Sequence, residues 1–261
     1  MLSPLQHLLV IVSGVLVGFM LSLIGGGGSI LAVPLLLYVV GYHNTHVVLG
    51  TTALAVALTA YLNIILHWRA HTVRWKPALI FAIPGAIGTA VGAHMGTLFP
   101  GKSLLFLFAL LMMGIALVMV RPRKQSSSQP EHARRSLLIR ILPVSFLVGL
   151  LAGFFGIGGG FLIVPGLMFA TGMPLVNAVG SSLLSVGLFG TTTAITYALA
   201  GYINWVIVAE YLLGGILGGI VGVRLSVSLA KQRNILMRLF AAVLFLIAVY
   251  MLYMNVTAIH W

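Results

Sequence analysis

The sequence predicts an all-α protein that crosses a membrane several times, and three observations lead to this prediction. Of its 261 residues, 61% are hydrophobic and 6% are charged, and the mean hydropathy is +1.16. Apolar stretches of ~20 residues, the length that spans a bilayer as a helix, recur along the chain. Two of the apolar stretches are interrupted by glycine-rich runs, at Gly25–Gly28 and Gly156–Gly160.

The apolar stretches of the first half define its expected helices. We expect helices at 5–24, 47–66, 78–98 and 104–120, with polar turns between them, and a shorter helix at 30–40. The shorter helix would be only ~16 Å long, so the helices at 5–24 and 30–40 either form a re-entrant pair, which leaves three full crossings, or both cross the membrane, which gives five. With an equivalent second half, this predicts about eight membrane segments, within a range of roughly six to ten.

The second half repeats the first. Ordered matches occur at two adjacent shifts, of 130 and 131 residues, and they indicate a duplication. The shift of 130 residues places Gly50-Thr51-Thr52 on Gly180-Ser181-Ser182. We therefore divide the chain into a first repeat (1–120), a basic linker (121–138) and a second repeat (139–261). At the other shift, of 131 residues, the matching pairs are Gly18 with Gly149, Gly25 with Gly156, Gly27 with Gly158, Gly28 with Gly159, Pro34 with Pro165, and Gly41 with Gly172.

The distribution of basic residues predicts that the two repeats have opposite orientations in the membrane. Short cytoplasmic loops of membrane proteins are enriched in Lys and Arg. With an odd number of crossings in each repeat, 13 of the 14 Lys and Arg lie inside and only Lys102 lies outside. With an even number, the split becomes 9 to 5. We therefore expect inverted repeats with both termini outside.

Each glycine-rich run is expected to break a helix and to form an anion site from main-chain atoms. A helix that starts at Ser29 or Gly160 points its unpaired N–H groups and the positive end of its dipole at the break. Pro34 and Pro165 can bend the short helices that follow. The alternative is that the glycines only allow close helix packing. The residues expected to contact the anion are Gly25, Gly26, Gly27, Gly28, Ser29, Gly156, Gly158, Gly159 and Gly160.

Hydroxyl groups follow each break and extend the expected site. Thr51 and Thr52, and Ser181 and Ser182 at the equivalent positions, lie several residues inside the next apolar helix. There they can donate hydrogen bonds to a bound oxyanion. The alternative is that these hydroxyls bond to the backbone of their own helix. Asn177, near the start of the second of these helices, is expected to cap it.

Glu210 is the only acidic residue within an expected membrane segment, because Glu131, the other acid, belongs to the linker. An ionisable group inside a membrane is a functional candidate, for example as a proton carrier. Glu210 is therefore a candidate coupling residue, and the alternative is a solvated position near the membrane interface.

The sequence offers no catalytic constellation, no metal-ligand set and no nucleotide-binding loop. We therefore expect no enzyme activity, no bound metal and no cofactor. The basic residues lie in short gaps between apolar runs rather than on one face of a soluble domain, so we expect no nucleic-acid partner.

The motifs together resemble those of a known family. Each glycine-rich run leads to Val-Pro and is followed by Gly50-Thr-Thr or Gly180-Ser-Ser, and then by His71-Thr-Val-Arg-Trp or Gly201-Tyr-Ile-Asn-Trp. This arrangement resembles the TauE/SafE family of membrane transporters, whose usual pattern is Gly-Ile-Gly-Gly-Gly before Val-Pro. The second copy matches that pattern fully, while the first has Gly26 where Ile is usual. The resemblance covers almost the whole chain except the linker.

The resemblance implies a secondary transporter of small anions in the bacterial plasma membrane. Members of the family are implicated in moving sulfite, sulfoacetate and other sulfur-containing or organic anions, commonly outward. We therefore expect a carrier of sulfur oxyanions or organosulfonates that sits in the lipid bilayer and is driven by an ion gradient or by its substrate's own gradient. Homo-oligomerisation is left open. Two alternatives remain, a membrane-embedded structural or assembly subunit without transport, and a proton- or cation-coupled carrier centred on Glu210.

Overall fold

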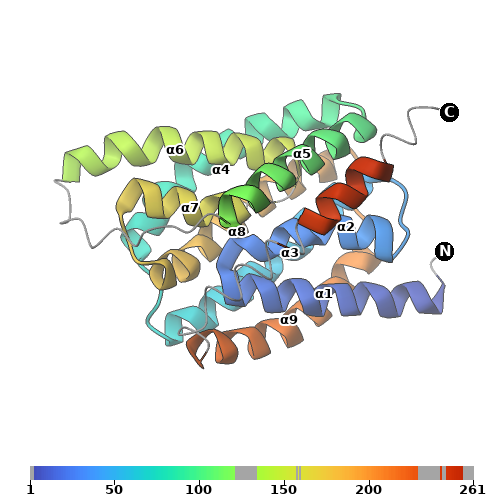
Figure 1. Cartoon of the computed structure of the whole chain (residues 1–261), viewed down its shortest axis with the longest axis horizontal. Helices are drawn as coiled ribbons and strands as arrows, with labels where there is room; N and C mark the ends of the chain where they lie inside the picture. The colour runs from blue at the N-terminus through green and yellow to red at the C-terminus, as the bar shows by residue number, and fades with distance from the viewer. Residues whose placement is uncertain are drawn as a thin grey trace.

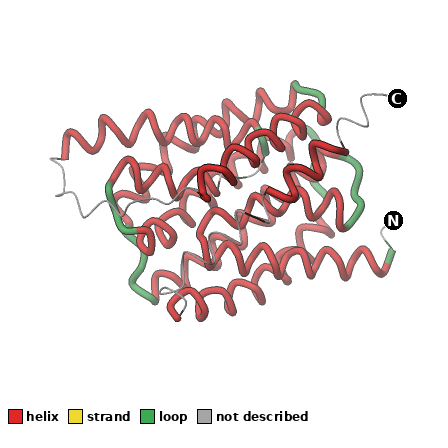
Figure 2. The backbone as a smooth tube through the Cα atoms, viewed as in Figure 1, coloured by secondary structure: helices red, strands yellow, loops and turns green. Residues whose placement is uncertain are grey.

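The computed structural model describes residues 3–120, 134–156, 158, 160–228, 242 and 245–254. Within these ranges all regular secondary structure is helical, as the sequence predicts (Figure 2). The elements in chain order are α1 (Pro4–Ile24), the 3₁₀-helix η1 (Gly25–Leu31), α2 (Ala32–Pro34), the π-helix η2 (Leu35–Val39), α3 (Thr45–Arg69), α4 (Trp75–Leu98), α5 (Gly101–Val120), α6 (Arg134–Phe154), α7 (Gly160–Thr171), α8 (Leu175–Leu199), α9 (Trp205–Ser228) and a last helix at Phe245–Met254.

Helix length and composition make this a multi-pass membrane protein. Large apolar side chains such as Leu62, Ile87 and Leu217 are exposed on the outer faces of their helices. In water such a surface would favour aggregation, but in a bilayer it contacts lipid. Among the described residues, the segments long and apolar enough to cross a membrane are Pro4–Val39, Thr45–Arg69, Trp75–Leu98, Val176–Leu199 and Trp205–Leu225.

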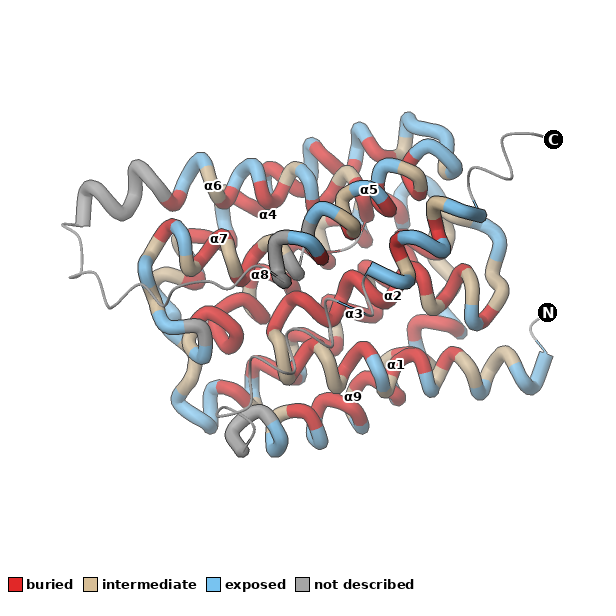
Figure 3. Tube along the Cα trace, in the orientation of Figure 1, coloured by how far each residue is buried: buried red, intermediate tan, exposed pale blue. Residues whose placement is uncertain are grey.

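The inner helices α3 and α8 form the centre of the molecule. In the most apolar stretch of each, 72% of the residues are buried, against 44% for the spans that contain α1, α4 and α9. Gly190 of α8 packs against Ala53 and Ala57 of α3, so these two helices touch directly. Figure 3 shows the same contrast, with long buried stretches at the centre and exposed stretches on the surrounding helices.

Two outer pairs, α1 with α9 and α4 with α6, approach closely through glycine. A Cβ atom added at Gly18 of α1 would overlap the backbone of Gly215 in α9, and one added at Gly149 of α6 would overlap the backbone of Gly85 in α4. Small residues allow such close approach between membrane helices. Gly18 and Gly149 correspond at the 131-residue shift, and Gly85 and Gly215 at the 130-residue shift. The same contact is therefore made twice, each time between the first helix of one half and the fourth helix of the other.

The first helices of the two halves run in opposite directions across the molecule. α1 starts on the right of Figure 1, where the N-terminus is marked, whereas α6 starts on the left. Inverted repeats are expected to show this arrangement. The boundaries of the linker stay a prediction, because 121–133 lie outside the described residues and α6 already begins at Arg134.

The helices end at two levels, one of which we call the basic end. Ser22, near the end of α1, lies against both His67 in the last turns of α3 and Gly222 near the end of α9. The ends of these three helices therefore lie together. Among the residues whose burial the structure describes, the exposed basic residues of this level are Arg69, Arg74, Lys76 and Arg224. The opposite end holds the N-terminus and the turn between α4 and α5 (Figure 1).

Left-handed backbone conformations occur at corresponding places in the two halves. The most informative pair is His71 and Gly201, which end the turns after α3 and α8 with φ values of +55° and +77°. Glycine adopts this region freely, whereas a side chain makes it unfavourable. Both halves therefore have the same left-handed turn, which suits Gly201 but is unfavourable for His71.

Two expectations about helix starts are wrong. The first short helix begins as η1 at Gly25 rather than at Ser29, because Gly25 reverses the backbone and the following glycines wind directly into a 3₁₀ turn. Asn177 does not cap α8, whose N-cap is Pro174. Its amide nitrogen instead donates to the carbonyl oxygen of Thr72 at 3.1 Å, which joins the two halves.

Candidate functional site

The first glycine-rich run ends α1 and begins η1 inside the packed part of the molecule. Gly25 has a φ of +72°, a conformation that glycine adopts without strain. All residues from Gly25 to Leu31 are buried. The hydroxyl of Ser29 donates to the carbonyl oxygen of Gly26 at 2.9 Å, which satisfies one main-chain group of the break. Polar backbone is thus buried in the protein interior, as a broken membrane helix requires.

A side chain from the other half holds this break in place. The hydroxyl oxygen of Ser182 accepts a hydrogen bond from the main-chain nitrogen of Gly26 at 3.3 Å and donates to the carbonyl oxygen of Val179 at 2.7 Å. A Cβ atom added at Gly25 would lie 2.8 Å from that hydroxyl and 3.1 Å from a methyl carbon of Val164 in α7. The first break is therefore packed between α7 and α8.

The second glycine-rich run lies against the other inner helix. Gly156 and Gly158 have φ values of +66° and +63°, and α7 begins at Gly160 as expected. A Cβ atom added at Gly156 would lie 2.8 Å from the Cβ atom of Leu49 in α3. Each break thus contacts the inner helix of the other half. Gly159, which is expected to contribute to the site, lies outside the described residues.

The helical segments that follow the two breaks lie side by side. η1 packs against α7, with Gly25 beside Val164, about one turn into α7. The first turn of a helix carries unpaired N–H groups and a partial positive charge. Two such first turns in the interior can stabilise an anion through the main chain, without a charged side chain.

The four predicted hydroxyl residues divide into two kinds by their partners. Thr51 and Ser181 accept hydrogen bonds from the main-chain nitrogens of Asn204 at 3.0 Å and Arg74 at 2.8 Å, just before α9 and α4. They fix the starts of helices that belong to the other half. Thr52 donates to its own helix at 2.7 Å, and Ser182 does the same while also holding the first break. Of the four, Ser182 alone is bonded to a glycine of the described breaks.

The two prolines lie within the short segments. Pro34 is followed directly by the π-helical turn Leu35–Val39, and Pro165 lies inside α7. A proline lacks the N–H that would continue the helical pattern. At Pro34 the chain responds by a change of helix type, and π-helical turns occur frequently at functional sites.

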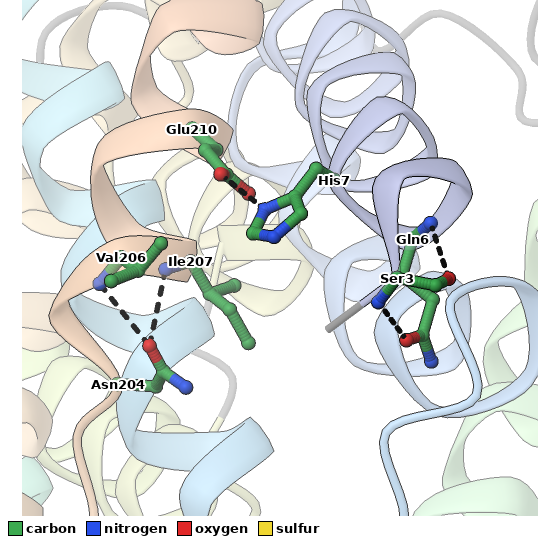
Figure 4. Close-up of polar contacts among 7 residues, drawn as sticks. All are labelled: Ser3, Gln6, His7, Asn204, Val206, Ile207 and Glu210. Carbon is green, nitrogen blue, oxygen red and sulfur yellow. Dashed lines mark hydrogen bonds and ion pairs between the residues drawn. The ribbon is translucent and has the colours of Figure 1, made fainter. Parts of the chain in front are cut away.

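Glu210 is paired with a residue that the sequence does not point to. Its Oε1 atom lies 2.5 Å from Nδ1 of His7, which projects from the first turns of α1 (Figure 4). The side chain of Glu210 is 20% exposed and that of His7 is 39% exposed. The Oε2 atom of Glu210 is buried and has no hydrogen-bond partner among the described residues. The two residues are 203 positions apart, so no local pattern could have joined them.

Metal ligands are not gathered in the described part of the chain, where no group of three or more His, Asp or Glu could hold an ion.

A family model described as "Sulfite exporter TauE/SafE" matches residues 10–251, which include both glycine breaks and both inner helices. The chain belongs to the TauE/SafE family. The glycine-rich runs that precede Val-Pro in its sequence form the two breaks, and the helical segments after these breaks lie side by side. The first run has Gly26 where the second has Ile157, and the main-chain nitrogen of Gly26 is the one that bonds Ser182.

Relatives of this TauE/SafE protein carry transporter names. One from Xylella fastidiosa, named "Probable membrane transporter protein", is 47% identical over 253 residues, which cover 95% of this chain and 96% of the relative. "Probable membrane transporter protein YunE" from Bacillus subtilis is 27% identical over 273 residues, which cover 95% and 98%. No solved structure matches the chain. The protein is therefore a membrane transporter of this family, and a multi-pass location in the bacterial inner membrane fits it.

Proposed function

We propose that the protein is a secondary transporter of small anions, with sulfur oxyanions or organosulfonates as its substrates. The observation that carries the proposal is the pair of buried glycine breaks, whose helical segments lie side by side and whose first break is held by Ser182 from the other half. Discontinuous helices near the centre of an inverted repeat are the usual substrate site of secondary transporters. The family description, sulfite exporter, supports a sulfur oxyanion as substrate.

The architecture suggests how access to the site alternates. The inner helices α3 and α8 contact each other, and each break rests on the inner helix of the opposite half. A movement of one half against the other would therefore change the surroundings of both breaks together. The chain carries no nucleotide-binding motif, so we propose that an ion gradient or the substrate's own gradient drives transport, and that the protein performs transport rather than catalysis.

Flux of anions into liposomes tests the proposal. Purified protein would be reconstituted and supplied singly with sulfite, sulfate, thiosulfate and small sulfonates, with a pH gradient imposed or collapsed. We expect flux of at least one of these anions. Folded protein that moves none of them would refute the carrier and favour the alternative, a structural or assembly subunit in which the glycines serve packing alone.

A second measurement tests where the anion binds. Ser182→Ala removes the oxygen that bonds Gly26, and leaving a buried N–H without a partner costs ~1–3 kcal/mol. The variant loses the hydrogen bond that holds the first break in its observed geometry, so we expect flux at low anion concentration to fall, by about tenfold for each 1.4 kcal/mol of anion affinity that is lost. Ser145→Ala is the matched control, because its hydroxyl is buried but bonds only its own helix, at Leu142. Equal flux in the two variants would place the anion elsewhere.

The pair of His7 and Glu210 favours a second candidate, in which proton binding is coupled to anion movement. The pair joins α1 to α9, which are the first helix of one half and the fourth of the other. A proton that changes the charge of the pair would change how strongly the two halves are held together at this level. The candidate predicts flux that responds to a pH gradient.

A further inference from the structure

A cluster of buried polar side chains lies at the basic end, where α1, α3 and α9 meet. Ser22, Asn63 and His67 are each at most 3% exposed. Two glycines of α9 make room for them. A Cβ atom added at Gly222 would lie 2.8 Å from Cβ of Ser22, and one added at Gly219 would overlap the side-chain oxygen of Asn63. Gly219 and Gly222 lie one turn apart, so Ser22 and Asn63 lie within about one helical turn of each other.

Two groups of this cluster that can donate hydrogen bonds have no acceptor. The hydroxyl of Ser22 and the amide nitrogen of Asn63 are buried without a hydrogen-bond partner among the described residues. Native proteins leave few buried polar groups unpaired, and each exception calls for an explanation such as a bound ion or ligand. Both groups lie on the same side of α9, where one small acceptor could be shared between them.

The imidazole of His67 is held by hydrogen bonds at both of its ring nitrogens. Its Nε2 atom lies 3.1 Å from the carbonyl oxygen of Ser22, which can only accept, so Nε2 carries a proton. Its Nδ1 atom lies 3.0 Å from the hydroxyl of Thr72, and that hydroxyl also lies 3.0 Å from the carbonyl oxygen of His67. That hydroxyl can donate either to Nδ1 of the neutral ring or to the carbonyl oxygen of His67, so the ring is held at both nitrogens and fixes the carbonyl of Ser22.

No carboxylate among the described residues competes for these donors. Glu210 lies nine residues before Gly219 on α9, about 14 Å along the helix axis. The exposed surface at this end carries Arg69, Arg74 and Lys76. A basic surface raises the local concentration of anions.

We propose that the side chains of Ser22 and Asn63 form a binding site for a small oxyanion at the basic end of the transport path, and that His67 positions this site through its hydrogen bond to the carbonyl of Ser22. The proposal rests on the anion-transport function proposed above and adds a second site to it. Ser22 is three residues before Gly25, and a Cβ atom added at Gly28 would overlap the main chain of Leu21, so the cluster adjoins the first break. An anion bound there would lie next to Gly25–Gly28, the proposed substrate site in the first break.

The other half leaves unpaired hydroxyls at the corresponding positions. Thr193 and Tyr197 correspond to Asn63 and His67 at the 130-residue shift. Their hydroxyls are likewise buried without a partner among the described residues. The tyrosine hydroxyl approaches α4, 3.4 Å from where a Cβ atom would lie at Gly96. Unpaired donors therefore occur at corresponding places on both inner helices, and each end has an imidazole nearby: at the other end the ring of His46 lies 6.2 Å from that of Tyr197.

Substitutions of the unpaired groups test the proposal, because a purely structural role predicts a different result. Removing an unpaired buried hydroxyl or amide removes only its desolvation penalty, so Ser22→Ala and Asn63→Leu should leave the thermal unfolding midpoint unchanged or higher. If the groups hold an oxyanion, both variants should bind sulfite at least tenfold more weakly. Binding would be measured by calorimetry on the full chain in lipid nanodiscs.

Matched controls separate this site from general effects. His67→Gln should weaken sulfite binding, whereas His94→Gln, on the exposed face of α4, should not. Ser145→Ala is the control for Ser22→Ala. Wild-type affinity for sulfite in both Ser22→Ala and Asn63→Leu would overturn the site, and so would wild-type protein that binds no sulfite.

The same preparations distinguish failure of this site from failure of the transport function. Normal flux by the wild type together with unchanged sulfite binding in the variants overturns the site and leaves the proposed function standing. Sulfite binding that depends on Ser22 and Asn63, in protein that moves no anion in liposomes, supports the site and overturns the function.

Discussion

Replacing Gly18 with alanine tests the packing on which the arrangement of the two halves depends. An added Cβ atom would lie 2.7 Å from both Cα and the carbonyl carbon of Gly215 in α9. Ordinary carbon contacts are ~3.5–4.0 Å, so α1 and α9 would have to separate by roughly 1 Å. Backbone atoms cannot rotate away, and overpacking of this kind costs up to ~3 kcal/mol. Alanine is more favourable than glycine in a helix by ~1 kcal/mol. We therefore expect the free energy of unfolding to fall by ~2 kcal/mol.

Gly114→Ala in α5 is the matched control, because no heavy atom lies within 4 Å of its added Cβ. It receives the same gain in helix propensity without the clash, so it should equal or exceed the wild type in stability. The free energy of unfolding would be measured in mixed micelles with increasing sodium dodecyl sulfate, followed by circular dichroism. Gly149→Ala, at the equivalent interface, should behave like Gly18→Ala. Equal stability of Gly18→Ala and Gly114→Ala would refute the close contact of α1 with α9.

Two further predictions concern coupling and backbone strain. Glu210→Gln removes the carboxylate that pairs with His7. It should abolish any stimulation of liposome flux by a pH gradient while membrane insertion stays normal. An unchanged response of flux to the pH gradient would refute the coupling role of Glu210. His71→Gly should raise the free energy of unfolding by ~0.5–1 kcal/mol, because a left-handed conformation costs a side-chain residue ~1–2 kcal/mol and glycine offsets part of the gain. Gly201→Ala should lower it by a similar amount, and changes of the same sign in the same micelle assay would contradict this reading.

Hydropathy, glycine placement and charge were enough to predict the class of the protein. Apolar runs long enough to cross a bilayer have few alternatives to helix, because every buried main-chain group must be bonded within the segment. The glycine-rich runs at Gly25–Gly28 and Gly156–Gly160 were expected to break helices, and left-handed backbone occurs at Gly25 and Gly156. The resemblance to the family could also be recognised from the sequence, because it rests on these glycines and on the Val-Pro that follows each run.

The partners of individual polar groups could not be predicted. Hydropathy places Thr51 and Ser181 inside helices, but only the fold shows that they accept hydrogen bonds from main-chain nitrogens of the opposite half. Asparagine is a favoured N-cap residue, yet the amide of Asn177 donates to the carbonyl oxygen of Thr72, 105 residues away. A hydroxyl or amide can satisfy itself locally or at a distance with similar energy, so local sequence does not decide between them.

The sequence by itself determined that this is a helical membrane protein of two related halves with a glycine break in each, because bilayer length, main-chain bonding and the repeat of glycines are written along the chain. Only the tertiary structure decided which surfaces meet. It placed α1 on α9 and α6 on α4, joined His7 to Glu210, and brought Ser22, Asn63 and His67 together against two glycines of α9. These contacts depend on how closely two backbones can approach, which is a property of a helix pair and not of either helix alone.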